Sequence, residues 1–422
     1  MAALAGFGCG DGLKVKGSFD RVIGESLTVK LTEGKPTFGS AVTLVDAAGT
    51  VFDANALRNR LISPRELSCV IPRGAQVGAA RLRLPRQGTS AEFAVPLTVS
   101  RLIVALDQAG AVQVLPLAGS VVSGGQVDTP LKGAQVSLSP DGGQLAVLTT
   151  PGDGLPNGQL RLYALAAPPR LLHTLDLEQP ALVVAATDDG VLVATAAQLI
   201  FYRADRENGL QTAWTVTLPQ VQALAVAAEA RFAAVLTRCD ADGDSTVDAD
   251  CVARVALDRD DAGQQLSAFT VLDRVPSAKL LALRRDGLAA VVADTQLVYG
   301  VLYGGTAPRL TAQAWDPSPA EPTSIDDAPS PIGDIFAISD QRNGVVFVVG
   351  FNPAAGNDLS VVRRSPVLDI APVALSFGRG TDLLVATRDA GIFGLDVATG
   401  KSTDQPLVSG PPAGLRSFVA QP

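Results

Sequence analysis

The feature that most constrains the fold is a strand-turn-strand pattern, which is clearest in residues 136–165, VSLSPDGGQLAVLTTPGDGLPNGQLRLYAL. Apolar runs stand on either side of a Ser-Pro-Asp-Gly-Gly turn, and a second turn leads into a third apolar run. Asp-Gly accepts the positive φ that a tight hairpin demands. The stretch therefore predicts three consecutive antiparallel strands.

Weaker copies of this pattern recur toward the C-terminus. The copies begin at Val136, Val183, Leu224, Leu281, Phe336 and Val373. Their intervals suit a repeating unit of four strands, which takes roughly 40 to 50 residues, with local insertions. Each copy is predicted to form the first two strands of one unit.

The two ends of this region complete one further unit. Residues 102–117 (LIVALDQAGAVQVLPL) align with residues 384–397 (LVATRDAGIFGLDV), the second and third strands of the last copy. The first unit thus lacks its innermost strand, and residues 415–420 (LRSFVA) are left without a partner at the C-terminus. We expect this segment to return to the first unit, because its return closes the ring and removes exposed sheet edges.

With these repeats, residues 101–422 resemble the seven-bladed β-propellers of the WD-repeat and Ser-Pro-Asp-Gly-type families. The resemblance implies a ring of seven four-stranded blades, closed by the C-terminal strand. It leaves the function open, since propellers host many unrelated activities.

Residues 11–100 form a different unit. Period-2 stretches such as 27–31 (LTVKL) and 41–45 (AVTLV), separated by turns with Gly and Pro, predict an immunoglobulin-like β-sandwich. Residues 66–75 (ELSCVIPRGA), 77–84 and 91–99 resemble the second half of an IPT/TIG domain, and 13–19 (LKVKGSF) match its first half more weakly. That family implies a spacer or binding module. The predicted fold class is all-β throughout.

Charge and hydropathy argue against nucleic acid as a partner and against a membrane span. The net charge is −8 and the pI is near 4.8, with no basic stripe, which argues against nucleic acid because phosphate binding needs clustered Lys and Arg. No window of about 18 residues is apolar without interruption, so a transmembrane span is not expected.

The N-terminal residues and the cysteines suggest export. Residues 1–10 (MAALAGFGCG) resemble the end of a bacterial lipoprotein signal, in which Cys9 would be lipidated; the alternative is an ordinary terminus with an incidental cysteine. Cys69 either pairs with Cys9 or is a buried free thiol. Cys239 and Cys251 bracket a short acidic loop, as a disulfide would in an exported protein. We expect an extracytoplasmic protein, secreted or in the bacterial cell envelope (periplasm or surface).

The strongest local motif is CDADGDSTVDADC, residues 239–251. Its oxygen-bearing residues alternate as the ligands of a calcium loop do, and hard oxygen ligands suit Ca²⁺. Asp240, Asp242, Asp244 and Asp248 occupy positions 1, 3, 5 and 9, the Thr246 carbonyl occupies position 7, and Asp250 stands at position 11. The motif resembles the calcium loops of EF-hands, dockerins and thrombospondin-type repeats, but Cys251 replaces the bidentate acid at position 12. We predict structural Ca²⁺; the alternative is a solvated acidic loop.

Long insertions indicate which face carries function, because loops carry function on a rigid scaffold. With strands labelled A to D outward, residues 149–158, 239–251 and 351–358 are predicted to join B to C, and the Pro-rich 316–331 to join D of blade five to A of blade six. B-to-C and D-to-A loops emerge on one face, which is the predicted binding surface. The alternative is that insertions accumulate where they do no harm.

Enzyme signatures are scarce. His173 is the only histidine, on a predicted outer strand of blade two, and neither a Gly-x-Ser-x-Gly elbow nor a phosphate-binding Gly-Lys-Ser/Thr occurs. The doublets Asp188-Asp189, Asp260-Asp261 and Asp326-Asp327 are assigned to turns or loops, where acids are solvated. Trp214 and Trp315 are predicted to pack on outer strands.

The sequence thus predicts a non-enzymatic extracytoplasmic binding or scaffold protein. One propeller face, with its calcium-stabilised loop, would bind a protein or polysaccharide partner. A propeller hydrolase or lyase with carboxylate catalysts at the central channel is the second hypothesis. A structural subunit of a surface assembly is the third.

Overall fold

The computed structural model divides the chain into two compact units, Met1–Leu102 with Pro116–Gly124, and Ile103–Leu115 with Gly125–Pro422. The structure describes residues 13–15, 20–31, 42–63, 66–72, 75–85, 92–117, 125–127, 135–149, 151, 155–165, 169–205, 207–218, 220–227, 232–240, 246–257, 267, 269–273, 279–303, 307–328, 335–352, 358–366, 368, 371–377, 382–387, 391–408 and 414–421. All regular structure in these residues is β-strand. They contain no helix long and apolar enough to cross a membrane.

Two sheets make up the first unit. The first sheet has the order β1(Leu13–Val15), β3(Ser26–Leu31), β7(Glu66–Val70), β6(Arg60–Ser63). The second has the order β5(Val51–Phe52), β4(Thr43–Val45), β8(Gly78–Pro85), β9(Glu92–Asp107), and β2(Asp20–Val22) runs parallel to β9. This second sheet is therefore mixed.

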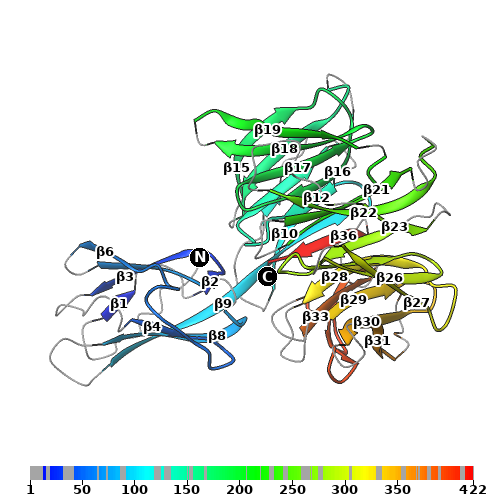
Figure 1. The fold of residues 1–422 in the computed structure, drawn as a ribbon. Helices are drawn as coiled ribbons and strands as arrows, with labels where there is room; N and C mark the ends of the chain where they lie inside the picture. Colours follow the sequence, from blue (N-terminus) through cyan, green and yellow to red (C-terminus); the bar gives the residue numbers. More distant parts are fainter. Residues whose placement is uncertain are drawn as a thin grey trace. The chain divides into compact units, whose positions relative to one another are not determined.

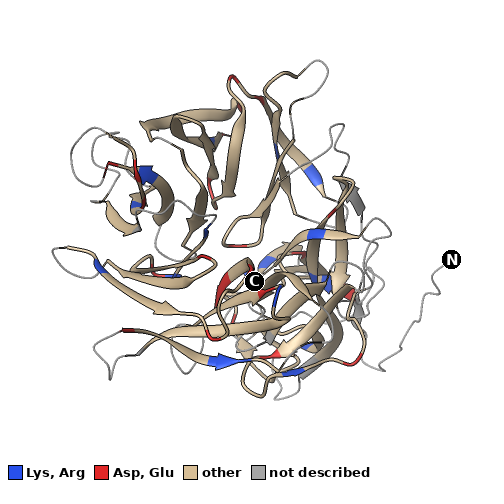
Figure 2. Ribbon diagram, turned by 90° about the vertical axis from the view of Figure 1, so that its right-hand side faces the viewer, with Lys and Arg blue, Asp and Glu red and all other residues tan. Residues whose placement is uncertain are grey.

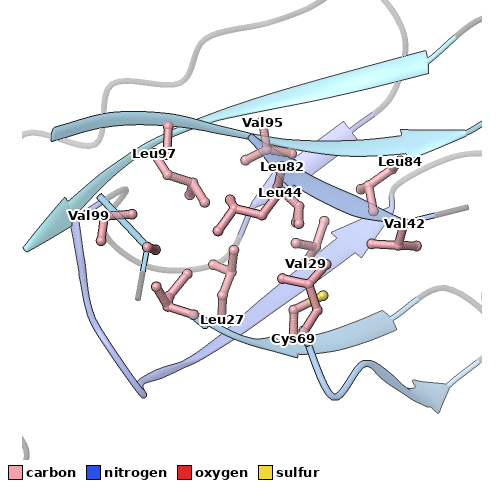
Figure 3. Close-up of a cluster of buried hydrophobic side chains, with 14 of the residues drawn as sticks. Leu27, Val29, Val42, Leu44, Cys69, Leu82, Leu84, Val95, Leu97 and Val99 are labelled. Atoms are coloured by element: carbon pink, nitrogen blue, oxygen red, sulfur yellow. The ribbon is translucent and has the colours of Figure 1, made fainter. Parts of the chain in front are cut away.

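One apolar core lies in this unit. On β3, Leu27 and Val29 are buried while Lys30 is exposed, so the period-2 pattern of the sequence places its apolar side chains in the core. In Figure 3, Leu27, Val29 and Cys69 point toward Leu82 and Val95 of β8 and β9. Leu82 and Val95 pair across the β8–β9 ladder.

The second unit is built from four-stranded antiparallel sheets that follow one another along the chain, called blades below (Figure 1). Their strands are labelled A to D in sheet order. Blade two is β12(Gln135–Leu138), β13(Gln144–Leu148), β14(Gln159–Ala164), β15(Arg170–Asp176); blade three is β16(Ala181–Ala186), β17(Gly190–Thr195), β18(Gln198–Asp205), β19(Gly209–Thr217); blade four is β20(Ala223–Val226), β21(Phe232–Cys239), β22(Ala249–Ala256), β23(Thr270–Asp273). Blade five is β24(Leu280–Leu283), β25(Ala289–Ala293), β26(Leu297–Leu302), β27(Arg309–Ala314); blade six is β28(Pro322–Ala328), β29(Ile335–Asp340), β30(Val345–Asn352), β31(Asp358–Arg364); blade seven is β32(Pro372–Phe377), β33(Asp382–Thr387), β34(Gly391–Asp396), β35(Lys401–Ser402).

Blade one combines segments from both ends of this region. Its strands B to D are the end of β9, then β10(Val112–Leu117) and β11(Gly125–Val127). Its strand A is the C-terminal β36(Leu415–Ala420), which pairs antiparallel with β9 so that Phe418 lies opposite Ala105. The predicted pairing of residues 415–420 with the first blade is confirmed.

Small and medium apolar side chains fill the spaces between successive blades. Every residue of β17 and of β25 is buried, because both faces of these strands pack on neighbouring sheets. Ala and Val therefore dominate strands that are buried on both sides. Figure 2 shows that most of the strand length is uncharged.

Polar side chains on strand A satisfy the exposed backbone edge of the next blade. Ser137 of blade two accepts a hydrogen bond from the Ala186 amide of blade three at 3.0 Å. Ser324 and Asp326 of blade six accept from the amides of Leu375 and Phe377 at 3.2 and 2.7 Å. Backbone amides at the inner edge of one blade thus donate to side chains of the preceding blade. These hydrogen bonds avoid the cost of unpaired backbone amides at a sheet edge.

Blade six differs from the sequence prediction by one strand. Residues 336–340 were expected to be strand A, but they lie in β29, strand B, and β28 from the Pro-rich segment is strand A. The sequence of β28, PTSIDDA, lacks apolar alternation because its side chains bond polar groups of neighbouring strands. As a consequence, residues 351–358 join strand C to strand D, on the face opposite to the one predicted.

Candidate functional site

The candidate site is the face on which strands B connect to strands C and strands D connect to the next blade. The connection from β21 to β22 in blade four contains the acidic motif. Cys239 and Cys251 form a disulfide there, with 5.9 Å between their Cα atoms and 12 residues of sequence separation. The predicted disulfide is therefore present in the structure.

The base of this loop is a regular strand ladder. Cys239 pairs with Ala249 and Thr237 with Cys251, so the disulfide links the two strands diagonally. The Asp248 amide donates to the Cys239 carbonyl at 3.1 Å. Asp240 and Thr246 are exposed and Asp248 is half-buried. Asp242 and Asp244 lie outside the described residues, as does Cys9 at the N-terminus.

Asp250 belongs to a buried ionic cluster between blades four and five. Its carboxylate, fully buried on β22, forms an ion pair with the ammonium group of Lys279 and accepts from Gln222 Nε2 at 2.9 Å. Lys279 precedes β24 of blade five, and its Nζ lies 3.9 Å from Asp294 Oδ2. A charge buried to this degree requires such partners, because an unpaired buried charge lowers the stability of the fold by about 3 to 5 kcal/mol.

Asp294 and Tyr299 complete the cluster from blade five. The Asp294 Oδ1 atom accepts from the amides of Gln296 and Leu297, both at 2.7 Å, and its Oδ2 atom lies 3.5 Å from the Tyr299 hydroxyl. The indole of Trp315 donates to the Asp294 carbonyl at 2.7 Å. The cluster therefore fixes the base of the acidic loop to the next blade.

This arrangement bears on the six predicted calcium ligands. The carboxylate of Asp250 already has two partners and faces blade five, so binding of Ca²⁺ by Asp250 would compete with Lys279 and Gln222. Within the described ranges, no three His, Cys, Asp or Glu side chains gather as a metal site. The remaining predicted ligands are Asp240, Asp242, Asp244, Thr246 and Asp248.

Sequence reasoning missed the two partners of Asp250. Gln222 and Lys279 each stand at the start of a blade, in the connection from the preceding strand D. A lone Lys before the apolar run LLAL was the available signal for Lys279. Nothing in the sequence pairs it with an aspartate 29 residues earlier.

The doublet Asp326-Asp327 lies on an inner strand rather than in the predicted loop. Both residues belong to β28, strand A of blade six. Burial raises the pKa of the Asp326 carboxyl to about 6, and this effect outweighs the hydrogen bonds from the amides of Phe377 and Asp327 and the charge of Arg285. Asp188-Asp189 lies in the predicted turn between β16 and β17, and Asp260-Asp261 is outside the described residues.

The aromatic and histidine predictions agree with the structure. His173 lies on β15, strand D of blade two. Trp214 on β19 is buried and packs on Phe201 with ring centroids 5.5 Å apart, and Trp315, directly after β27, packs on Phe347 at 4.9 Å. Cys69 is a buried free thiol, and burial raises its pKa to about 12. Neither tryptophan is an exposed platform.

No family model and no curated protein matches the chain. A solved structure of a functionally unknown protein from Desulfotomaculum acetoxidans has 15% identity and a TM-score of 0.50, covering 72% of this chain and 94% of that chain. Apo AztD from Citrobacter koseri has 11% identity and a TM-score of 0.49, over 76% of this chain and 98% of that one. Sqt1 from Chaetomium thermophilum has 13% identity and a TM-score of 0.45, over 63% and 69%. At this identity the first likeness concerns the fold alone, and with the sheets described above it shows an all-β chain with a β-propeller-like fold.

Proposed function

We propose that this protein is a non-enzymatic extracytoplasmic binding or scaffold protein, which presents the face of its B-to-C and D-to-A connections to a protein or polysaccharide. The observation that carries the proposal is the acidic loop of blade four, closed by the Cys239–Cys251 disulfide and fixed at its base by buried Asp250 and Lys279. A loop whose two ends are fixed in this way has less conformational entropy to lose on binding, which favours recognition.

The proposal includes a closed seven-bladed propeller. Strand β36 pairs with β9 and also contacts β32 of blade seven and β12 of blade two. These contacts support a ring whose last strand completes its first blade. We further propose that the first unit is an immunoglobulin-like domain of the IPT/TIG type, which serves as a spacer. Its two sheets around one core support that assignment.

An extracytoplasmic location is supported by the disulfide, because disulfides persist in oxidising compartments. Lipidation of Cys9 would attach the chain to the bacterial envelope; without it the protein would be periplasmic or secreted. Globomycin treatment, which blocks lipoprotein signal cleavage, should change the mass of the protein if Cys9 is lipidated. An unchanged mass argues for the unlipidated form.

Structural Ca²⁺ in the acidic loop is part of the same proposal. Five aspartates lie between the two linked cysteines, and the four other than Asp250, namely Asp240, Asp242, Asp244 and Asp248, repel one another unless a cation offsets their charge. Of these, Asp248 is half-buried. Titration calorimetry should show Ca²⁺ uptake by the wild type and none by the Asp242→Ala, Asp244→Ala double variant. The matched control is Asp205→Ala, which replaces an exposed aspartate at the end of strand C of blade three. Equal heats from wild type and double variant would exclude the site.

Capture from an envelope fraction tests the binding face. The full chain should retain a partner that is lost when this face is altered, for example by Asp240→Lys with Thr246→Lys, two exposed loop positions. Asp205→Lys, at the opposite ends of the strands, should retain the partner. If chelation leaves capture unchanged, the metal has no part in binding. If both lysine variants capture equally, the partner does not use this face.

The second hypothesis, a hydrolase or lyase at the channel, is favoured by one observation. Asp326, on an inner strand, has a carboxyl pKa raised to about 6, as a general acid requires. The same carboxylate bonds the Phe377 amide at 2.7 Å, which is a structural role. Hydrolysis of an envelope polysaccharide by the wild type, abolished in Asp326→Asn while the fold is kept, would support the enzyme. Equal activity in both would exclude this role.

A further inference from the structure

The ionic cluster between blades four and five provides a reference for the other blade interfaces. On blade five, Val292 pairs with Tyr299, and one register step beyond the Leu280–Ala293 pair, Lys279 stands opposite Asp294. Lys279, Asp294 and Tyr299 all face blade four. Their side chains fill the end of this interface on the B-to-C face.

At the corresponding place between blades two and three, none of the three residues is charged or aromatic. On blade three, Val193 pairs with Ile200 in the register of Val292 with Tyr299, so Ile200 replaces the tyrosine. Thr195, which ends strand B, replaces the aspartate, and Ala181, which pairs with Thr195, replaces the lysine. The space that a lysine ammonium and its partners fill in one interface is therefore not filled by the equivalent residues in the other.

A pocket opens at this place. It is shallow and open to solvent, and Leu177, Val193 and Ile200 form its apolar wall. Its polar lining includes Glu178, Gln198 and Tyr202. Leu177 and Glu178 lie in the connection from strand D of blade two to strand A of blade three, so the pocket belongs to the B-to-C and D-to-A face.

The lining has a negative group and no compensating cation. Glu178 is exposed, and in the part of the chain that the structure describes no ion pair or side-chain hydrogen bond holds its carboxylate. Burial raises the pKa of the Tyr202 hydroxyl, and the negative charge of Glu178 adds to the rise, which places these two groups within electrostatic reach of each other. An aromatic ring and a carboxylate beside an aliphatic wall suit an ammonium on an apolar stem.

We propose that this pocket binds a primary alkylammonium group on an aliphatic stem, namely a lysine side chain of a protein partner. The ammonium would lie near Glu178 and the Tyr202 ring, and the methylene groups would pack on the partly exposed Ile200. The inference rests on the proposed function, since it specifies the partner chemistry of the same face. It selects a protein with an exposed lysine over a neutral polysaccharide.

Binding of a lysine analogue to the full chain tests the pocket. Nα-acetyl-L-lysine methylamide, followed by saturation-transfer NMR, should bind with a Kd of about 1 mM, the range expected for a ligand of this size. Acetylation of its ε-amine should weaken binding at least fivefold, because the charge is lost. Glu178→Gln should do the same, and Ile200→Tyr, which restores the side chain of blade five, should abolish binding.

Glu207→Gln is the matched control, an exposed glutamate between strands C and D of the same blade, on the opposite face. Its affinity should equal that of the wild type. Equal binding to wild type and Glu178→Gln, or no saturable binding of the charged analogue, overturns the inference. Since Glu178 is exposed, its variant is expected to fold even if Ile200→Tyr does not.

The same variants separate this inference from the proposed function. A partner captured from the envelope fraction equally by wild type and Glu178→Gln would preserve the proposed binding face and reject the lysine pocket. Analogue binding that depends on Glu178, with no partner captured by the wild type, would support the pocket and count against the binding role of the face.

Discussion

At the scale of single residues, one buried polar side chain stands at the same position of strand B in each blade. These residues are Asp107, Thr149, Thr195, Thr237, Asp294, Asp340 and Thr387, all 0 to 6% exposed. Several hold the turn that follows: Asp107 accepts from the Ala111 amide at 2.8 Å, and Asp340 from the Asn343 amide at 3.2 Å. A buried turn amide left unpaired would cost about 1 to 3 kcal/mol.

Lys279 supplies the buried positive charge that pairs with Asp250. Lys279→Met removes the ammonium from Asp250 and leaves a fully buried carboxylate with Gln222 as a remaining donor. We expect the free energy of unfolding to fall by about 3 to 5 kcal/mol, because an uncompensated buried charge is costly. Urea unfolding followed by circular dichroism measures the change.

The double variant Asp250→Asn, Lys279→Met is the control for Lys279→Met. Removing both charges should recover most of the lost stability, since a buried pair contributes little net energy relative to neutral residues. If the double variant is as unstable as the single one, the loss comes from packing of the lysine stem and not from the isolated charge.

Asp326 should make stability depend on pH in the direction opposite to most aspartates. Its folded pKa of about 6 lies above the ordinary value near 3.8, so the folded state binds more protons in between. The contribution to stability is full below about pH 4 and is lost as the pH rises through 6. Relative to Asp326→Asn, the wild type should lose up to about 3 kcal/mol between pH 4 and 7.

Asp205→Asn is the comparison for that titration. Hydrogen bonds from the amides of Asn208 and Glu207 lower the pKa of the exposed Asp205, so its contribution is lost only as the pH falls below its ordinary range. The difference between wild type and Asp205→Asn should therefore stay flat between pH 4 and 7. A flat difference for Asp326→Asn as well would mean that the Asp326 carboxyl is not shifted.

At the scale of strands, five of the six repeated hairpins lie where the sequence predicts them. The exception begins at Phe336: it was predicted to form strands A and B of blade six, and it forms strands B and C. Apolar alternation identifies strands that bury side chains between blades, and β28 lacks it because its Ser and Asp side chains bond the next strand. The polar residue of strand B carries the missing information: Ile-Ser-Asp340 matches Val-Ala-Asp294 and Val-Ala-Thr387. That match places residues 336–340 in strand B.

The candidate site is predictable only in part. Two cysteines around an acidic loop suffice to predict the disulfide, because both ends of the pattern lie close in sequence. The pairing of Asp250 with Lys279, and the open space beside Ile200, depend on which side chains of neighbouring blades meet. These contacts arise from the register of strands in different sheets, which local periodicity does not specify.

The disulfide should stabilise the connection between β21 and β22. Replacing Cys239 and Cys251 with Ala opens a loop with 12 residues of sequence separation, and loop entropy predicts a loss of about 3 kcal/mol. Thermal unfolding without reductant measures this loss. With reductant, wild type and variant should unfold alike. Cys69→Ala, the control, should keep the reductant dependence, whereas its disappearance would mean that a different cysteine pair matters.

At the scale of the whole molecule, the fold depends on a strand from the far end of the chain. Truncation after Gly414 removes β36, with the buried Leu415 and Phe418, and leaves β9 of blade one without its inner partner. We expect a large loss of thermal stability and a shift to dimers or larger species, because an unpaired apolar edge recruits another chain. Unfolding scans and size-exclusion chromatography with light scattering measure both effects.

A peptide of residues 415–422 added in trans should reverse these effects, since it restores the strand that pairs with β9. A peptide with Phe418→Asp is the matched control and should fail, because that side chain is buried. If the truncated chain stays monomeric with an unchanged unfolding temperature, the pairing of β36 with β9 contributes nothing to the stability of the fold. Rescue by the wild-type peptide, with no rescue by the Phe418→Asp peptide, is the expected result. It would mean that side-chain packing of the buried Phe418, as well as backbone pairing with β9, completes blade one.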